Sequence, residues 1–123
     1  MKRDMDLVRL ILMKIEDKPN NRPEMEFNID GYEAKEVLYH LTLLEEAKLI
    51  EGMHLSSRDG GGKVVHPTRL TWTGHEFMDA SRDPTRWDQA KVAAAKAGGF
   101  GLDIFAKLLA SMAMEAGKRA ANL

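Results

Sequence analysis

The residues best suited to chemistry are the four histidines and a glycine-rich loop. His75, Glu76 and Asp79 follow the start of the H-E-x-x-H pattern of zinc metalloproteases, which places two zinc ligands on one helix face. That pattern requires a second histidine at the position that Asp79 occupies. The protease motif therefore fails.

Two other arrangements also lack a required partner. His54 and His66 flank the glycine-rich loop, but two histidines without thiolates or nearby acidic residues rarely bind a metal, and the chain has no cysteine. Asp59 precedes three glycines and Lys63, yet no G-K-[ST] ends the loop, as phosphate binding requires. We expect no catalytic residue, no metal site, no cofactor and no enzymatic activity.

Composition narrows the class of protein. The 123 residues suffice for one domain with its own core plus a tail, and 44% hydrophobic with 30% charged residues is typical of a folded globular chain. The net charge of −1 provides no long-range attraction for nucleic acid, so any DNA contact must be local. Without cysteines, a signal peptide or a long apolar run, the chain is expected in the cytoplasm, with no membrane contact.

Apolar spacing predicts the elements of the first half. Helical periodicity covers residues 4–16, and alternation predicts a short strand over residues 25–29. A second helix over residues 32–47 has an outward face that carries Tyr39 and Leu43. Its inward face contains Ala34, Val37, Leu38, Leu41 and Leu44.

The second half begins with a predicted β-hairpin. Strands over residues 50–56 and 64–72 flank a turn at residues 58–63, and a helix follows from residue 73. Further helices are expected over residues 87–97 and 102–118, separated by glycines, and Trp72 and Trp87 are expected in the core or between domains. We predict a domain over residues 1–81 and a C-terminal helical extension over residues 82–123.

The stretches YHLTLLEEAKLIEG and TRLTWTGHEFMDA resemble winged-helix proteins. In that family x-H-L-x-x-L-x-x-A-x-L-I ends the recognition helix, and L-T-x-x-G begins the helix after the wing. The resemblance implies an α+β winged-helix-like domain, although residues 25–31 read as strand and turn where a helix-turn-helix has a bracing helix. The matching positions are His40, Leu41, Leu44, Ala47, Leu49, Ile50, Leu70, Thr71 and Gly74.

A narrower resemblance spans nearly the whole chain. MKRDMDLVRLIL, GYEAKEVLYHLTLLEEAKLIEG and LTWTGHEFMDASRD, together with Trp87, are similar to a family of short phage and prophage proteins, domain of unknown function number 2513. This resemblance implies a phage association and no established activity.

The leading functional hypothesis is a DNA-binding transcriptional regulator. Residues 31–50 carry four glutamates against two lysines, whereas residues 56–72 carry three basic residues against one aspartate. Carboxylates repel phosphate, so double-stranded DNA is expected to contact chiefly the wing, which is the predicted β-hairpin over residues 50–72. The candidate DNA contacts are Lys35, Tyr39, Thr42, Arg58, Lys63 and Arg69.

The alternative is a protein-binding inhibitor or adaptor, for example an anti-defence protein that acts on a host protein. Tyr39 and Leu43 form an exposed apolar pair on the predicted recognition helix. The last helix has its own apolar stripe, which either packs back on the domain or forms a homodimer. That stripe includes Phe105, Leu108, Leu109 and Met112.

Overall fold

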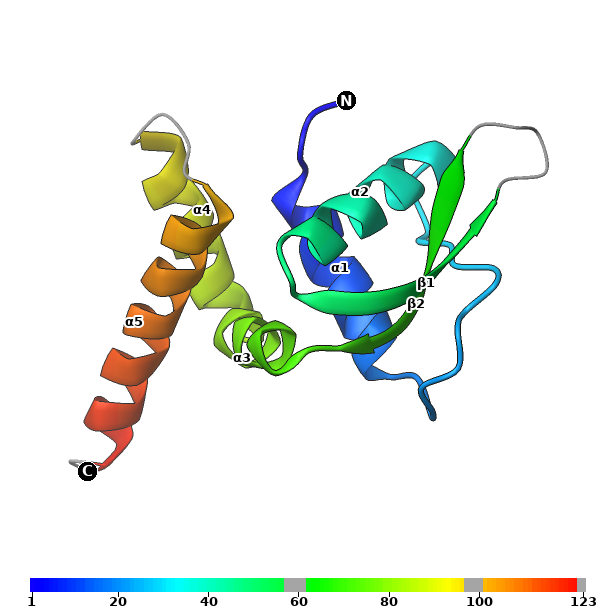
Figure 1. The fold of residues 1–123 in the computed structure, drawn as a ribbon. Coiled ribbons are helices and arrows are strands. Elements are labelled where there is room, and N and C mark those ends of the chain that lie inside the picture. Colours follow the sequence, from blue (N-terminus) through cyan, green and yellow to red (C-terminus); the bar gives the residue numbers. More distant parts are fainter. Residues whose placement is uncertain (57–61, 97–100, 122–123) are drawn as a thin grey trace. The chain divides into compact units, whose positions relative to one another are not determined.

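The computed structural model describes residues 1–123 except 57–61, 97–100 and 122–123. The described chain is an α+β protein with five helices and one two-stranded antiparallel sheet (Figure 1). It divides into two compact units, Met1–His75 and Glu76–Leu123, whereas the domain limits expected at residues 81 and 82 stay a prediction. The elements are α1 (Met5–Glu16), α2 (Ala34–Glu46), β1 (Ile50–Ser56), β2 (Lys63–Leu70), α3 (Trp72–Ser81), α4 (Pro84–Lys96) and α5 (Leu102–Ala121).

The first helix is confirmed. Its apolar stripe is fully buried, because the helical period places every apolar position of that stripe on one face. The carboxylate of Asp4 accepts the backbone N–H groups of Asp6 and Leu7 at 2.9 and 3.2 Å, which caps the helix start. The buried residues are Leu7, Val8, Ile11, Leu12 and Ile15.

The strand predicted over residues 25–29 is wrong, because this segment forms bends and no ladder. Of the three alternating apolar residues only Phe27 is buried, with the ammonium of Lys14 4.9 Å from its ring centre. The segment just before it meets the sheet through Glu24, whose N–H donates to the carbonyl of Pro67 at 3.0 Å and whose carbonyl lies 3.2 Å from Nδ1 of His66. The alternating apolar pattern over residues 25–29 therefore marks one buried side chain, that of Phe27, and not a strand.

The helix expected over residues 32–47 is present as α2, but its buried face is narrower than predicted. Ala34 is exposed and Leu38 is 37% exposed, so placing both on the inward face was wrong. His40, at only 1% exposure, lies inside with the aliphatic residues. The stripe that the 3.6-residue period buries consists of Val37, His40, Leu41 and Leu44.

His40 ties the two helices of the first unit together. Its Nε2 accepts the backbone N–H of Asp4 at 2.9 Å, and its Nδ1 lies 2.8 Å from the carbonyl of Glu36. This geometry fits the tautomer with its proton on Nδ1, which donates to that carbonyl. Tyr32 lies at the same junction, where burial and the carboxylates of Asp4 and Asp6 raise the pKa of its hydroxyl.

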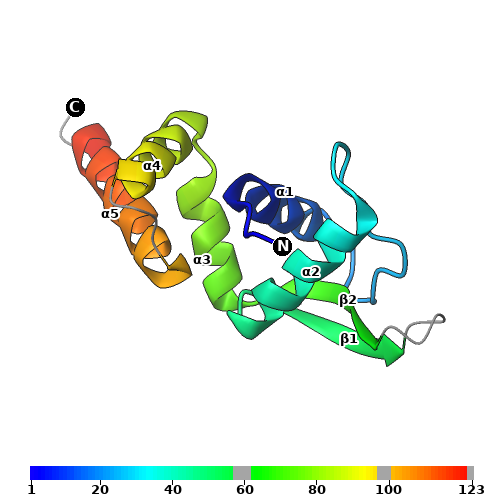
Figure 2. The same ribbon diagram turned by 90° about the horizontal axis from the view of Figure 1, so that it is seen from above.

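The predicted hairpin is confirmed, although β2 ends at Leu70 and Trp72 belongs to α3. Ile50 pairs with Leu70 and Glu51 with Arg69, and a register shift follows between Glu51 and Gly52. Both α1 and α2 pack against β2, and the two helices contact each other (Figures 1 and 2). The first unit is therefore two helices on a twisted two-stranded ribbon.

The second unit is helical. The ring of Phe77 meets the buried ring of Trp87 edge-on at 6.3 Å, so the expected core position of Trp87 is confirmed. The carboxylate of Asp83 accepts the N–H of Arg86 at 3.0 Å, which lowers the pKa of Asp83 and starts α4 before the predicted residue 87. The helices α4 and α5 lie side by side (Figure 2).

None of the helices in the described ranges combines the length and apolar character that a membrane span requires.

Candidate functional site

The end of α2 has the hydrogen bonds of a Schellman motif. The N–H of Leu49 donates to the carbonyl of Leu44 at 3.0 Å, and the N–H of Lys48 donates to that of Glu45 at 2.9 Å. This motif places Lys48 in the left-handed region, at φ 62°. Glycine is usual at that position, because a Cβ there costs about 1–2 kcal/mol.

Thr71 joins this helix end to the start of α3. Its hydroxyl donates to the carbonyl of Lys48 at 2.7 Å and accepts the N–H of Gly74 at 3.0 Å, while its own N–H donates to the carbonyl of Leu49 at 3.0 Å. A Cβ added to Gly74 would lie 2.0 Å from the Leu49 carbonyl oxygen. The L-T-x-x-G pattern therefore encodes a joint between α2, β1 and α3.

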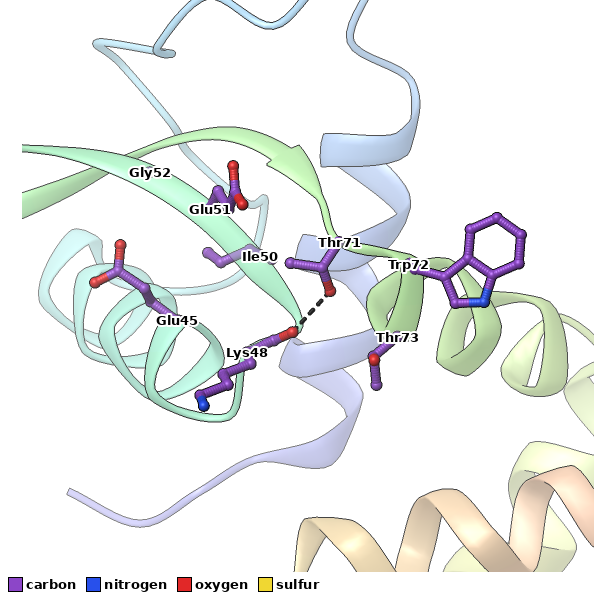
Figure 3. Close-up of a pocket in the computed structure, with 8 residues that line it drawn as sticks. All are labelled: Glu45, Lys48, Ile50, Glu51, Gly52, Thr71, Trp72 and Thr73. Atoms are coloured by element: carbon purple, nitrogen blue, oxygen red, sulfur yellow. Dashed lines mark hydrogen bonds between the residues drawn. The ribbon is translucent and has the colours of Figure 1, made fainter.

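A pocket of about 580 Å³ lies at this joint (Figure 3). Glu45 and Lys48 line it from the end of α2, residues 50–52 from β1, and residues 71–73 from the start of α3. Trp72 is 79% exposed, so its expected place in a core was wrong, and its expected place between domains stays a prediction. Figure 3 shows Lys48 and Trp72 on opposite sides of Thr71. A ligand that touches both must be extended.

Each acidic residue of the pocket lining already has a hydrogen-bond partner within the protein. Glu45 bonds to Nε2 of His54, and Glu51 accepts both Nε and Nη2 of Arg69 at 3.1 and 3.0 Å. Lys48 is exposed and forms no ion pair within the described part of the chain. Lys48 is therefore the charged side chain of the pocket lining that has no ion-pair partner among the described residues.

Several of the predicted DNA contacts already have partners within the protein. Lys35 is exposed but lies 3.7 Å from the carboxylate of Glu33, and Arg69 is held by Glu51. The Thr42 hydroxyl donates to a carbonyl of its own helix at 3.2 Å, and Tyr39 is partly exposed with its ring edge-on to His40. Lys63 is exposed at the start of β2, and Arg58 lies outside the described residues.

The predicted protein-interface residues lie on α2 in the first unit and on α5 in the second. Leu43 is half-buried beside the partly exposed Tyr39. On α5, Leu109 is fully buried and the half-buried Met112 lines a cavity of about 330 Å³ with residues of α4. The side chains of Phe105 and Leu108 lie outside the described part of the structure.

The two hairpin histidines do not face each other. His54 pairs with Val65 and His66 with Met53, so the histidines project from opposite faces of the ribbon. His66 Nδ1 lies 3.2 Å from the carbonyl of Glu24. Among the residues with described positions, no group of three or more histidines or acidic residues is placed to hold a metal ion.

Comparison with known proteins settles the family. The family described as "Hypothetical protein (DUF2513)" matches residues 2–100. The chain belongs to the DUF2513 family. An uncharacterised protein of Haemophilus influenzae is 37% identical over 92 residues, which are 74% of this chain and 76% of that protein. No solved structure matches the chain.

The pocket of this DUF2513 protein was not predicted from the sequence. Its wall contains Thr71, which the L-T-x-x-G pattern marked only as a position that matches winged-helix proteins. A usable signal was Lys48, which stands where a helix that ends in a Schellman motif normally has glycine. The exposed Trp72 follows from the same joint, because α3 begins at that residue and turns it away from the ribbon.

Proposed function

We propose that residues 1–81 form a winged-helix-like domain in which α2 occupies the place of the recognition helix. The order α1, α2, β1–β2 hairpin and α3 supports this assignment. The two helices also pack on the hairpin, as a wing requires. A bracing helix before α2 is missing, since residues 17–33 contain no helix, and this weakens the docking geometry that DNA recognition uses.

We propose further that the protein is a non-enzymatic protein-binding module, such as an inhibitor or adaptor. The observation that supports this most is a tryptophan 79% exposed beside a pocket of about 580 Å³. Tryptophan is strongly enriched among residues that dominate binding energy, because its ring buries a large apolar area and its N–H finds a partner. Trp72 is the anchor and the pocket is the contact surface.

The same geometry argues against a strong phosphate-binding surface. A phosphate must displace Glu51 from Arg69 and approach Lys35 beside Glu33. Both steps break or weaken ion pairs that already exist within the protein. That cost offsets the new ion pairs with phosphate on which DNA affinity depends. Protein binding uses surface that the fold leaves exposed.

Selection of randomised peptides displayed on phage tests this function with Trp72→Ala as the key variant. We expect peptides that bind the wild-type protein to lose roughly thirtyfold in affinity for Trp72→Ala, because truncation of a dominant interface tryptophan costs about 2 kcal/mol. Titration of synthetic peptides by fluorescence anisotropy measures the change. The matched control is Val92→Ala, an exposed apolar residue on α4, which should leave binding unchanged. No selected peptide above background, or equal binding to Trp72→Ala, contradicts the proposal.

A second candidate, transcriptional regulation through DNA contact by the wing, is favoured by the exposed Lys63 at the start of β2. We expect any such binding to weaken steeply with salt, and Lys63→Glu to weaken it further, because phosphate contacts release counterions. A gel-shift titration at two salt concentrations measures both effects, with exposed Lys96→Glu on α4 as the control. Absence of any shift with genomic fragments at low salt removes this candidate.

Other parts of the proposal concern context. We propose a phage or prophage origin, a cytoplasmic location and a host protein as partner, in keeping with the resemblance noted above. A homodimer through α5 is also proposed. Leu109 is already fully buried, so a dimer must exchange or re-pair α5 rather than add a second copy to an exposed stripe.

A further inference from the structure

The Schellman motif explains the left-handed backbone at the end of α2, but it does not explain why a lysine occupies that position. Lys48 occupies a left-handed position, at φ 62°, where glycine fits without a Cβ penalty. Within the described chain its side chain forms no ion pair that offsets this strain. Strained backbone concentrates at binding sites, because the strained residue places a needed group. The Lys48 ammonium is therefore a candidate ligand-binding group.

The charge around Lys48 indicates what it binds. The two carboxylates of the pocket are paired, Glu45 with His54 and Glu51 with Arg69. Glu46 is exposed on the last turn of α2, outside the pocket lining. A ligand that pairs with the Lys48 ammonium therefore breaks no existing hydrogen-bonded pair of the pocket. A carboxylate is the complementary group that a protein partner supplies.

We propose that the pocket binds an acidic segment of a partner protein, an inference that rests on the protein-binding function proposed above. An aspartate or glutamate of the segment pairs with the Lys48 ammonium, and an apolar neighbour packs on Trp72. Because Lys48 and Trp72 lie on opposite sides of Thr71, one small carboxylate does not reach both (Figure 3). An extended segment with an acidic and an apolar residue does.

Lys48→Gly separates binding from stability. It relieves the left-handed strain, so we expect the variant to melt a few degrees higher than the wild-type protein by differential scanning calorimetry. It also removes the ammonium, so peptides selected from the displayed random library should bind roughly tenfold or more weakly in anisotropy titrations. Lys48→Arg keeps the charge and should retain binding within about threefold.

The selected sequences decide the chemistry of the partner. Enrichment in aspartate and glutamate, with loss of binding in Lys48→Gly, supports the inference. Enrichment in lysine and arginine, or peptides that lose affinity for Trp72→Ala and keep it for Lys48→Gly, overturns it while the protein-binding function stands. A lower melting temperature for Lys48→Gly also overturns it, because Lys48 would then stabilise the helix end. Failure to select any peptide removes the protein-binding function itself.

Discussion

Gly74→Ala is expected to lower the free energy of unfolding by about 3 kcal/mol or more. The added Cβ would lie 2.0 Å from the carbonyl oxygen of Leu49, which is backbone and cannot rotate away. That oxygen also accepts the N–H of Thr71, so moving it breaks the bond that holds the start of α3. Urea denaturation followed by circular dichroism measures the loss.

Gly117→Ala is the matched control for this prediction. Gly117 lies within α5, and a Cβ at this position meets no atom within 4 Å. The control should therefore leave stability unchanged or raise it by about 0.5–1 kcal/mol, since alanine favours helix. A Gly74→Ala protein as stable as the wild type contradicts the close approach of α3 to residue 49.

His40→Ala is expected to cost about 3 kcal/mol of unfolding free energy. The substitution empties a site that is 1% exposed and leaves the N–H of Asp4 without its 2.9 Å acceptor. It also separates the start of α1 from α2, because the same ring contacts the carbonyl of Glu36. Urea denaturation again gives the magnitude.

The control for His40 is His75→Ala, an exposed histidine expected to change stability by less than about 0.5 kcal/mol. Nitrogen-detected NMR of the imidazole adds a second measurement. We expect the ring proton of His40 on Nδ1, since Nε2 accepts a backbone N–H. A ring proton on Nε2, or equal stability of the two alanine variants, contradicts this role.

The fold was predictable from the sequence wherever the apolar residues repeat with a single period, either that of a helix or that of a strand. The buried stripe of α1 and the two hairpin strands follow directly from apolar spacing, because burial there is decided locally. The same use of apolar spacing was wrong for residues 25–29. Its alternation matched a strand, but a strand needs a hydrogen-bonded neighbour, and only the preceding Glu24 bonds to β2.

The pocket was less predictable, because it depends on contacts between residues far apart in sequence. Thr71 meets the carbonyl of Lys48 only after the hairpin has returned the chain to the end of α2. Trp72 carried the apolar character of a core residue, and its exposure follows from the exact residue at which α3 begins. His40 was identified only as a match to the winged-helix pattern, and its hydrogen bond with the N–H of Asp4 could not be predicted from residue spacing.

The joint at Thr71 has a consequence for the way the first unit opens. One threonine bonds to two successive carbonyls, those of Lys48 and Leu49, and also to the N–H of Gly74. We therefore expect the last turn of α2 and the first turn of α3 to fray together, although Gly74 follows Leu49 by 25 positions in the sequence. We therefore expect amide hydrogen exchange at these two ends to follow a single cooperative opening, with the joint and its pocket as one unit of local stability.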